Sequence, residues 1–158
     1  MSTFALLAPV PLEHLQSGEL ACRDHGTVSF ATRAWEVFDE LNKLRGGPTG
    51  SPVDVFIYAS DDPLNERLEA SWLGRYRRYH KAIGGKPPAS IVRPQSTALE
   101  DAAPFDTKSS PAVFWELDRL SMIQIDKREL IRTFVGYGTN NLFAKTFVPE
   151  RPMIVTHP

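Results

Sequence analysis

The sequence has little of several features by which enzymes and metalloproteins are commonly identified. It contains one cysteine, Cys22, so an internal disulfide is excluded, and no Cys/His spacing typical of a metal site surrounds it. The four histidines are scattered along the chain, and no two of them form the His-x-x-x-His pattern of a zinc protease. The formal net charge is −1, so no overall field attracts nucleic acid or anionic lipid. The sequence therefore predicts no metal site and assigns no catalytic residue.

Long apolar segments and a cofactor signature are lacking as well. No run approaches the roughly 20 apolar residues of a membrane helix. The first residues, MSTFALLAPVPLEHL, lack the basic start and the cleavage site of a signal peptide. The glycines of VGYGTNN (135–141) lack the third glycine and the βαβ unit of a dinucleotide site. We therefore expect a cytoplasmic protein with no membrane partner and no cofactor.

What the sequence does contain is typical of one globular domain. Of its 158 residues 42% are hydrophobic and 23% are charged, so a core can form without disulfides. Thirteen prolines predict many short elements, because proline ends helices and removes a donor from sheets. Residues 84–111, rich in proline and serine, predict a long irregular loop of the kind that is functional or mobile. A single domain over residues 1–158 is expected.

Alternating hydrophobicity and turn residues place the regular elements. Apolar, β-rich runs predict strands at residues 3–10, 26–31, 53–60, 112–123 and 151–158. Helix signals predict a single turn over residues 11–18 that stops at Gly18, a helix over residues 32–45 capped by Thr32, and a short helix over residues 126–134 capped by Asp126. Glycine and asparagine predict a turn at residues 136–141.

Residues 64–83 fit two conflicting patterns. Helical spacing relates the apolar and aromatic positions Leu64, Leu68, Trp72, Tyr76, Tyr79 and Ile83. Strand alternation over residues 69–81 instead places Ala70, Trp72, Gly74 and Tyr76 on one inner face. Gly74 would cost a helix about 1 kcal/mol, and the density of Trp and Tyr favours a strand. Periodicity alone leaves both interpretations open.

The order of the elements, with the segments VFIYAS, ASWLGRY and VFWELDRL in it, carries a resemblance. Over residues 26–158 the chain resembles the PUA-like superfamily, in particular its EVE-type and ASCH-type branches. The resemblance implies an α+β fold, a mixed, mostly antiparallel, partly open β-barrel with short peripheral helices. It also implies that residues 69–81 form a strand antiparallel to residues 53–60. Members typically bind RNA or DNA, and several hold a modified or flipped base in an aromatic pocket.

Aromatic residues with a few polar neighbours are the candidates for such a base pocket. A base needs apolar faces and some oriented hydrogen-bonding groups. The predicted pocket consists of Phe30, Arg33, Trp35, Tyr58, Ser60 and Trp72. Tyr58 and Ser60 share one strand face next to a turn, which suits a pocket floor. The alternative is that the tryptophans belong to the core.

A cluster of cations and aromatics follows within a dozen residues. Arginine and lysine neutralise phosphates, and aromatic faces stack on unpaired bases. The predicted contacts to a nucleic-acid backbone are Arg75, Arg77, Arg78, Tyr79, His80, Lys81 and Lys86. The alternative is a solvated edge strand whose charges block aggregation between sheets.

Three functions compete at this point. The leading hypothesis is a non-catalytic nucleic-acid-binding domain that takes RNA or DNA and holds one modified or flipped base in the aromatic pocket. The first alternative is a protein-interaction or regulatory module of a bacterial or phage system. The second alternative is a small nucleotide-acting hydrolase or transferase with residues 84–111 as its lid, for which the sequence offers no evident nucleophile or base.

Overall fold

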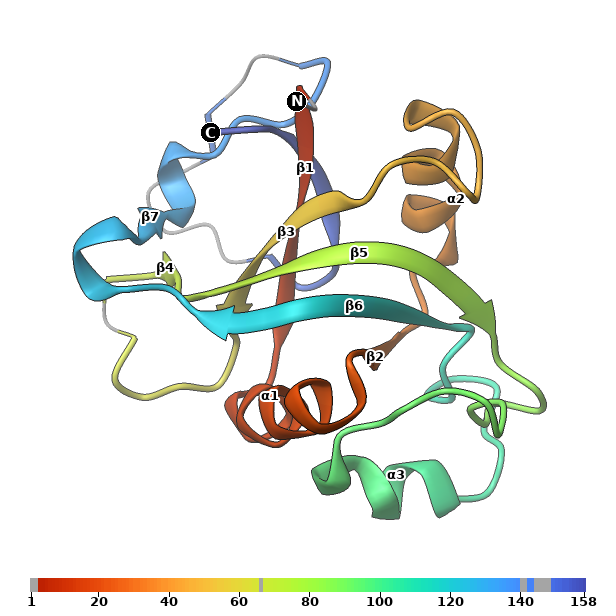
Figure 1. Cartoon of the computed structure of the whole chain (residues 1–158). Coiled ribbons are helices and arrows are strands. Elements are labelled where there is room, and N and C mark those ends of the chain that lie inside the picture. The colour runs from red at the N-terminus through yellow and green to blue at the C-terminus, as the bar shows by residue number, and fades with distance from the viewer. Residues whose placement is uncertain (1–2, 66, 140–141, 144–148) are drawn as a thin grey trace.

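The main feature of the fold is one sheet with two unequal ends. The computed structural model describes residues 3–65, 67–139, 142–143 and 149–158. In these residues one sheet has the order β2-β6-β5-β3-β1-β8, and a small second sheet pairs β4 with β7 (Figure 1). The strands are β1 Phe4–Val10, β2 Val28–Thr32, β3 Val53–Ala59, β4 Glu69–Ala70, β5 Trp72–Lys81, β6 Val113–Met122, β7 Glu129–Leu130 and β8 Met153–Thr156.

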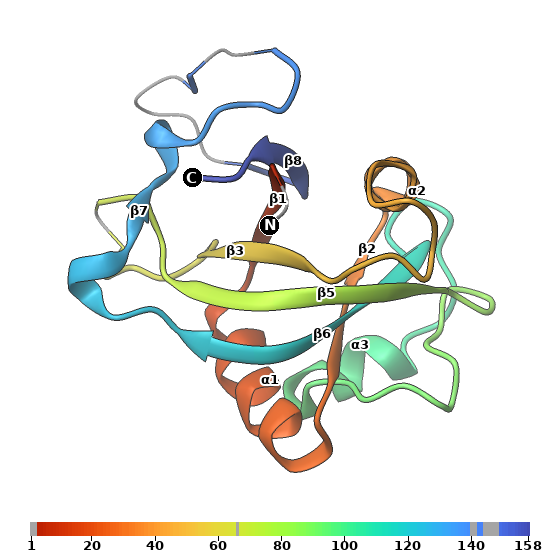
Figure 2. The same cartoon turned by 45° about the horizontal axis from the view of Figure 1, so that its top comes forward.

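Helices cover the ends and one face of this sheet. The α-helices in the described residues are α1 Leu12–His25, α2 Trp35–Leu44 and α3 Ala98–Ala102, and the 3-10 turns are Gln95–Thr97, Ile125–Lys127 and Ile131–Thr133. In Figure 2, α1 lies below β5 and β6, α2 lies above them near the end of β5, and α3 lies beyond α1. None of the described helices is both long enough and apolar enough to span a membrane.

The sheet is mixed and open. β1 and β3 are parallel, whereas the other neighbouring strands of the large sheet are antiparallel. β2 and β8 form its two ends and do not pair with each other in the described residues, so no closed barrel is formed. The α+β class, the mostly antiparallel sheet and the short helices are confirmed. The PUA-like assignment stays a prediction.

The conflict over residues 64–83 is resolved in favour of the strand. β5 pairs antiparallel with β3, with Val53 opposite Tyr76 and Ile57 opposite Trp72. Gly74 suits this strand for a steric reason, because a Cβ there would lie 3.2 Å from Leu117 Cδ1 on β6. A larger residue would therefore require the Leu117 side chain to move by a few tenths of an ångström.

Two hydrophobic clusters lie on opposite faces of β3. The main core contains Val53, Val55 and Ile57, on which α1 and α2 pack. A smaller second core contains Tyr58, with Phe56 packed against it, and is covered by residues 129–134. The alternation predicted for residues 53–60 is thus confirmed, and β3 is central with both faces covered.

The helical turn predicted to end at Gly18 is wrong. α1 continues through Gly18 to His25 and ends at Gly26, whose φ of 87° is a left-handed helix cap. Gly18 is buried in the helix, and a Cβ there would lie 3.0 Å from Phe30 Cζ. Glycine is needed at this position for the close approach of α1 to β2, which outweighs its low helix propensity of about 1 kcal/mol.

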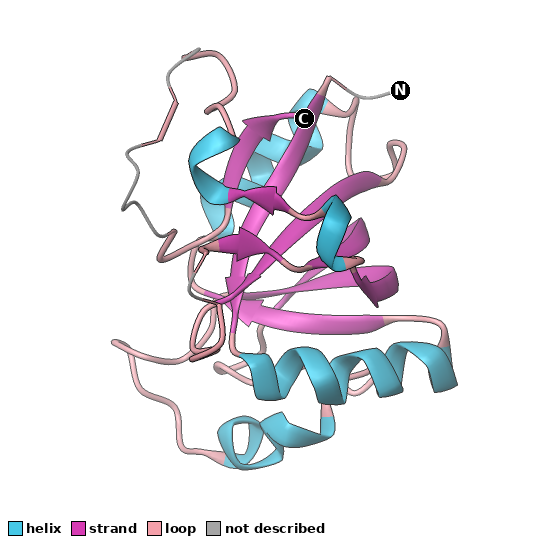
Figure 3. Ribbon diagram, turned by 90° about the vertical axis from the view of Figure 1, so that its left-hand side faces the viewer, coloured by secondary structure: helices cyan, strands magenta, loops and turns pink. Residues whose placement is uncertain are grey.

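The helix predicted for residues 126–134 is also wrong. Two 3-10 turns flank β7, which pairs with β4 through Glu69 opposite Leu130. The 3-10 turn Ile131–Thr133 brings both Ile131 and Phe134 into the second core. This single turn accounts for the helix-like spacing of the two apolar residues. The two short strands face the viewer in Figure 3. Of the turn predicted at residues 136–141, residues 137–139 are a turn, and residues 140–141 lie outside the described residues.

Candidate nucleic-acid interface

The outer face of β5 carries arginines that are matched by acids on β6. Arg75 donates from Nε and Nη2 to the two carboxylate oxygens of Asp118, at 2.9 and 3.0 Å. The hydrogen bond to Asp118 raises the pKa of Arg75, and the charge of Asp54, opposite Arg75 on β3, acts in the same direction. This predicted phosphate contact is therefore already occupied by a carboxylate.

The next cations along β5 pair with two carboxylates of β6, Asp118 and Glu116. Arg77 lies 3.4 Å from Asp118, while Arg78 lies 3.4 Å and His80 3.1 Å from Glu116. Acidic partners so close reduce the field that these cations present to a phosphate. The strand is consequently much less basic than its sequence alone indicates.

Lys86 does not join the other predicted contacts. Its Nζ donates to the backbone carbonyl oxygens of Asp101 and Ala103, at 3.1 and 3.2 Å. These bonds fix one part of the 84–111 segment to another. The segment is also less irregular than predicted, because it contains a 3-10 turn and α3.

Beyond the core, β5 and α2 enclose a concave surface that we call the basic hollow. Its volume is about 370 Å³, and it is lined by Asp39, Asn42, Lys43, Gly47, Pro48, Arg78, Tyr79 and Lys81. Three residues predicted to contact a nucleic-acid backbone, Arg78, Tyr79 and Lys81, thus line the same hollow. It also contains a cation, Lys43, that the sequence did not single out. Lys43 pairs only loosely with Asp39, at 3.8 Å, and Lys81 forms no salt bridge with a described residue.

A further arginine strengthens the positive potential at this corner. Arg45 donates to the carbonyl oxygen of Pro48 at 2.6 Å and so closes the loop after α2. Burial lowers the pKa of Arg45, and the nearby cations Arg77 and Arg78 act in the same direction. Arg45 also lies over the ring of Tyr76, 4.7 Å from its centroid. The loop after α2, which contributes Gly47 and Pro48 to the wall of the hollow, is therefore held in place by Arg45.

The aromatic side of the hollow is anchored in the core. Tyr79 lines the hollow and packs partly against the main core. Below it, the buried Tyr76 donates its hydroxyl to Asn42 Oδ1 at 3.0 Å. Burial is the main reason that the pKa of Tyr76 lies well above its usual value. Tyr79, which packs on this core, offers the hollow an aromatic face on which a planar group can stack.

The six residues of the predicted base pocket do not come together in one place. Phe30 is buried under α1, and Trp72 is 2% exposed within the main core. Tyr58 lies in the second core, on the opposite face of the sheet. Burial, followed by the charge of Asp62, raises the pKa of Tyr58. Ser60 is exposed, just after the end of β3.

The remaining two pocket candidates lie near the start of α2. Arg33 donates to the carbonyl oxygen of Thr107 at 2.9 Å, and Trp35 is 49% exposed at the first residue of α2. Arg33 lines a cavity of about 420 Å³ whose wall includes Trp115. The indole Nε1 of Trp115 is buried and has no hydrogen-bond partner among the described residues. We call this cavity the α2 cavity. Among the places where the predicted pocket residues lie, it comes closest to a site of the size of a base.

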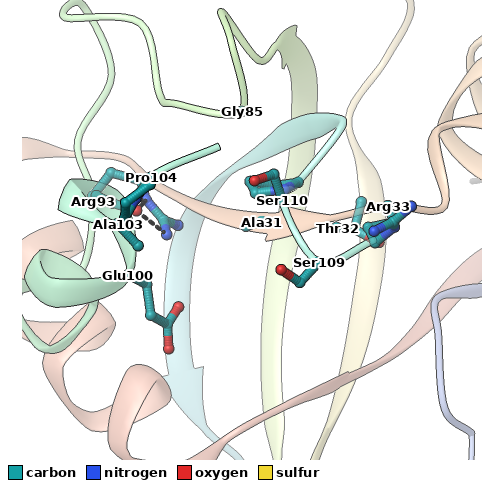
Figure 4. Close-up of a pocket in the computed structure, with 12 residues that line it drawn as sticks. Ala31, Thr32, Arg33, Gly85, Arg93, Glu100, Ala103, Pro104, Ser109 and Ser110 are labelled. Atoms are coloured by element: carbon teal, nitrogen blue, oxygen red, sulfur yellow. Dashed lines mark hydrogen bonds and ion pairs between the residues drawn. The ribbon is translucent and has the colours of Figure 1, made fainter. Parts of the chain in front are cut away.

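Figure 4 shows a second cavity beside Arg33, between β2 and the 84–111 segment. Arg93, in its wall, donates to both carboxylate oxygens of Asp101 and to the carbonyl oxygen of Ser29, and lies over the ring of Phe114. The contacts with Ser29 and Phe114 hold the 84–111 segment on the sheet, and those with Asp101 join two parts of the segment. Arg93 is therefore occupied as a structural cation.

Sequence reasoning missed Lys43 and Arg45 as members of this site. Both lie at the end of the helix predicted over residues 32–45, where the helix dipole alone accounts for cations. Nothing in the spacing relates residues 43–45 to residues 78–81, because only the packing of α2 beside β5 joins them. Among the described residues, no group of three or more His, Cys, Asp or Glu side chains is arranged to hold a metal ion.

Comparisons with protein-family models, with curated proteins and with solved structures find no match to this chain.

Proposed function

We propose that the protein binds single-stranded nucleic acid, RNA or DNA, through the basic hollow. The observation that supports this proposal is the convergence of Lys43, Arg78 and Lys81 around the ring of Tyr79 in one concave surface. The cations neutralise consecutive phosphates, and the ring stacks on an unpaired base. A double helix would not insert a base into such a surface, so the unpaired strand is the better ligand.

The proposal gives expected magnitudes. Three phosphate contacts on a single strand give a slope of log K against log salt of about −2, because each contributes roughly −0.7. Stacking on Tyr79 contributes about 1–3 kcal/mol per base. The affinity therefore combines a salt-dependent part from the cations with a salt-independent part from the ring.

The test is fluorescence anisotropy with labelled dodecamers of thymidine and of uridine over a range of KCl concentrations. Replacing both Arg78 and Lys81 by alanine is expected to weaken binding at least tenfold and to flatten the salt slope. The matched control is Arg75→Ala, whose guanidinium already pairs with Asp118 on the outer face, and which should leave the affinity within twofold. Equal losses in both variants would contradict the proposal.

A separate variant isolates the aromatic contribution. Tyr79→Leu keeps an apolar side chain against the core but removes the stacking face, so it should weaken binding about tenfold with an unchanged salt slope. An unchanged affinity would show that electrostatics alone holds the strand.

The α2 cavity is a second place for a single flipped or modified base. The buried, unpartnered Nε1–H of Trp115 favours it, because such a donor is expected to find an acceptor. Trp115→Phe removes this donor and keeps an aromatic ring. Saturation-transfer NMR with free nucleosides should show contacts in the unmodified protein that Trp115→Phe loses, and identical spectra would exclude the cavity.

A further inference from the structure

A serine, a histidine and a glutamate meet where the 3-10 turn Gln95–Thr97 and α3 dock on α1. Ser96 Oγ lies 2.7 Å from His14 Nδ1, and Glu100 Oε1 lies 3.0 Å from His14 Nε2. His14 belongs to α1, whereas Ser96 and Glu100 are four residues apart on the 3-10 turn and α3. Helical spacing brings these two side chains to one face, and the docking of α3 on α1 brings both to His14.

One histidine tautomer satisfies both contacts. The Glu100 carboxylate accepts a hydrogen bond, so it selects the form with hydrogen on Nε2. Nδ1 is then free to accept the Ser96 hydroxyl proton. Nucleophile, base and a third group that orients the base are the arrangement by which proteins activate a serine.

Open space lies next to His14 and Glu100. His14 and Glu100 line a cavity of about 170 Å³ whose other walls are largely apolar, with Val10, Pro11 and Phe30 among them. Glu100 also borders the cavity of about 400 Å³ in Figure 4, where its side chain extends away from Arg93. Ser96 itself is half-buried rather than sealed in the core. A small apolar group fits the first cavity and a polar group the second.

We infer that Ser96, His14 and Glu100 form a hydrolytic site for esters of short acyl chains, with Ser96 as nucleophile, His14 as general base and Glu100 as a positioning residue. This activity is independent of nucleic-acid binding at the basic hollow, since the two sites share no residue.

The reaction balances with water as the only co-reactant. Ser96 Oγ bonds to the ester carbonyl carbon while its proton moves to His14 Nδ1. The bond to the leaving oxygen then breaks, and the alcohol departs with that proton. Water, deprotonated by His14, attacks the acyl-serine, which releases the carboxylic acid and restores Ser96.

The same contacts also join the 84–111 segment to α1, so a test must separate catalysis from docking. The Ser96 hydroxyl has a second possible acceptor, the Glu13 carbonyl oxygen at 3.5 Å, which is more distant than His14 Nδ1. The Ser96 backbone N–H donates to Ser17 Oγ at 3.0 Å. Ser17 contributes to docking alone. Ser17→Ala is therefore the matched control for Ser96→Ala.

The experiment treats the full chain with a fluorophosphonate probe, locates the adduct by mass spectrometry and measures hydrolysis of p-nitrophenyl acetate and butyrate. The adduct is expected on Ser96. Ser96→Ala and His14→Gln should lower the rate at least about 100-fold, the range typical of a lost general base, and Ser17→Ala should keep it within threefold. Glu100→Gln should lower kcat about tenfold with KM unchanged, which a purely structural role would not do.

Three results would overturn the inference. They are the absence of an adduct on Ser96, equal rates of hydrolysis by Ser96→Ala and the unmodified protein, and an unchanged kcat in Glu100→Gln. If His14→Gln fails to fold, the position of the adduct on the unmodified chain still decides. Arg78→Ala with Lys81→Ala should leave hydrolysis unchanged, which keeps this test separate from that of the basic hollow.

Discussion

The two faces of β5 use the same stretch of chain in opposite ways. On the inner face Trp72, Gly74 and Tyr76 pack into the main core. On the outer face Arg75 is held by Asp118 of β6. Past the bulge between Tyr76 and Arg78, the inner face continues beyond the core into the basic hollow.

This difference shows that a cation's position relative to its cross-strand partners decides what it can do. An arginine held by two short hydrogen bonds to an acid of the next strand, as Arg75 is by Asp118, stabilises the sheet locally and is a poor phosphate contact. A lysine or arginine at the end of the strand, where the facing element is a helix terminus, keeps part of its field for a ligand. Mutations on the inner face should therefore change mainly the stability of the fold. Mutations on the outer face should change mainly the charge that the strand presents to solvent.

The largest expected effect is on the inner face. Tyr76→Ala removes a fully buried ring that contacts Phe38, together with its hydrogen bond to Asn42. It should lower the free energy of unfolding by about 3–5 kcal/mol, measured by urea denaturation. Tyr76→Phe is the control and should cost about 1 kcal/mol. A loss below 1 kcal/mol for the alanine variant would mean that the inner face does not determine stability.

A smaller effect is expected from the ion pair on the outer face. The double-mutant cycle of Arg75→Ala and Asp118→Ala should give only a small coupling energy, because the pair lies at the surface, where solvent screens it. Urea unfolding at low and high salt measures it, with the coupling decreasing in high salt. A coupling as large as the loss of stability in Tyr76→Ala would remove the contrast between the faces.

The next variant tests whether the comparison extends to binding. Glu116→Gln frees Arg78 from its carboxylate while leaving a side chain of nearly the same shape. If the basic hollow binds single strands, their affinity should rise a few-fold, because Arg78 no longer shares its charge with a carboxylate. Asp118→Asn, which frees Arg75, should not change the affinity. Anisotropy titrations measure both, and a gain confined to Asp118→Asn would reverse the assignment of the faces.

The smallest effect concerns pH. The hydrogen bond from His157 to Asp54, at 2.8 Å, raises the pKa of His157 above its unfolded value of about 6.5. This stabilisation is complete below that value and is lost as pH rises through the folded pKa. The melting temperature should therefore fall slightly from pH 6 upward. His157→Gln should flatten that fall, and an identical pH profile in both proteins would contradict the contact.

Local sequence patterns predicted the parts of the fold that depend on local alternation. β3 and β6 were identified because each has a clear two-residue period and ends in turn residues. β5 has an equally good helical period, so its assignment depended on the resemblance rather than on its own residues. Gly18 was misread because its role, the approach of Phe30, depends on a contact between separate elements.

The candidate site was less predictable for the same reason. The sequence identified Arg78, Tyr79 and Lys81, but it could not show that Glu116 and Asp118 face the cations of β5. Two register shifts between β5 and β6 determine which acid meets which arginine, and no local rule encodes them. The contact of His14 with Ser96 joins residues 82 positions apart and likewise has no local signal.

The pairing of β1 with β8 places an early strand beside a very late one, with Phe4 opposite Thr156. While a ribosome is still making this chain, the outer edge of β1 has no partner until the segment that contains residues 153–156 has left the exit tunnel. A strand edge left open for that long is a template for intermolecular pairing. Nascent chains stalled before residue 153 should therefore be stronger clients of ribosome-associated chaperones than folded chains that contain residues 153–156.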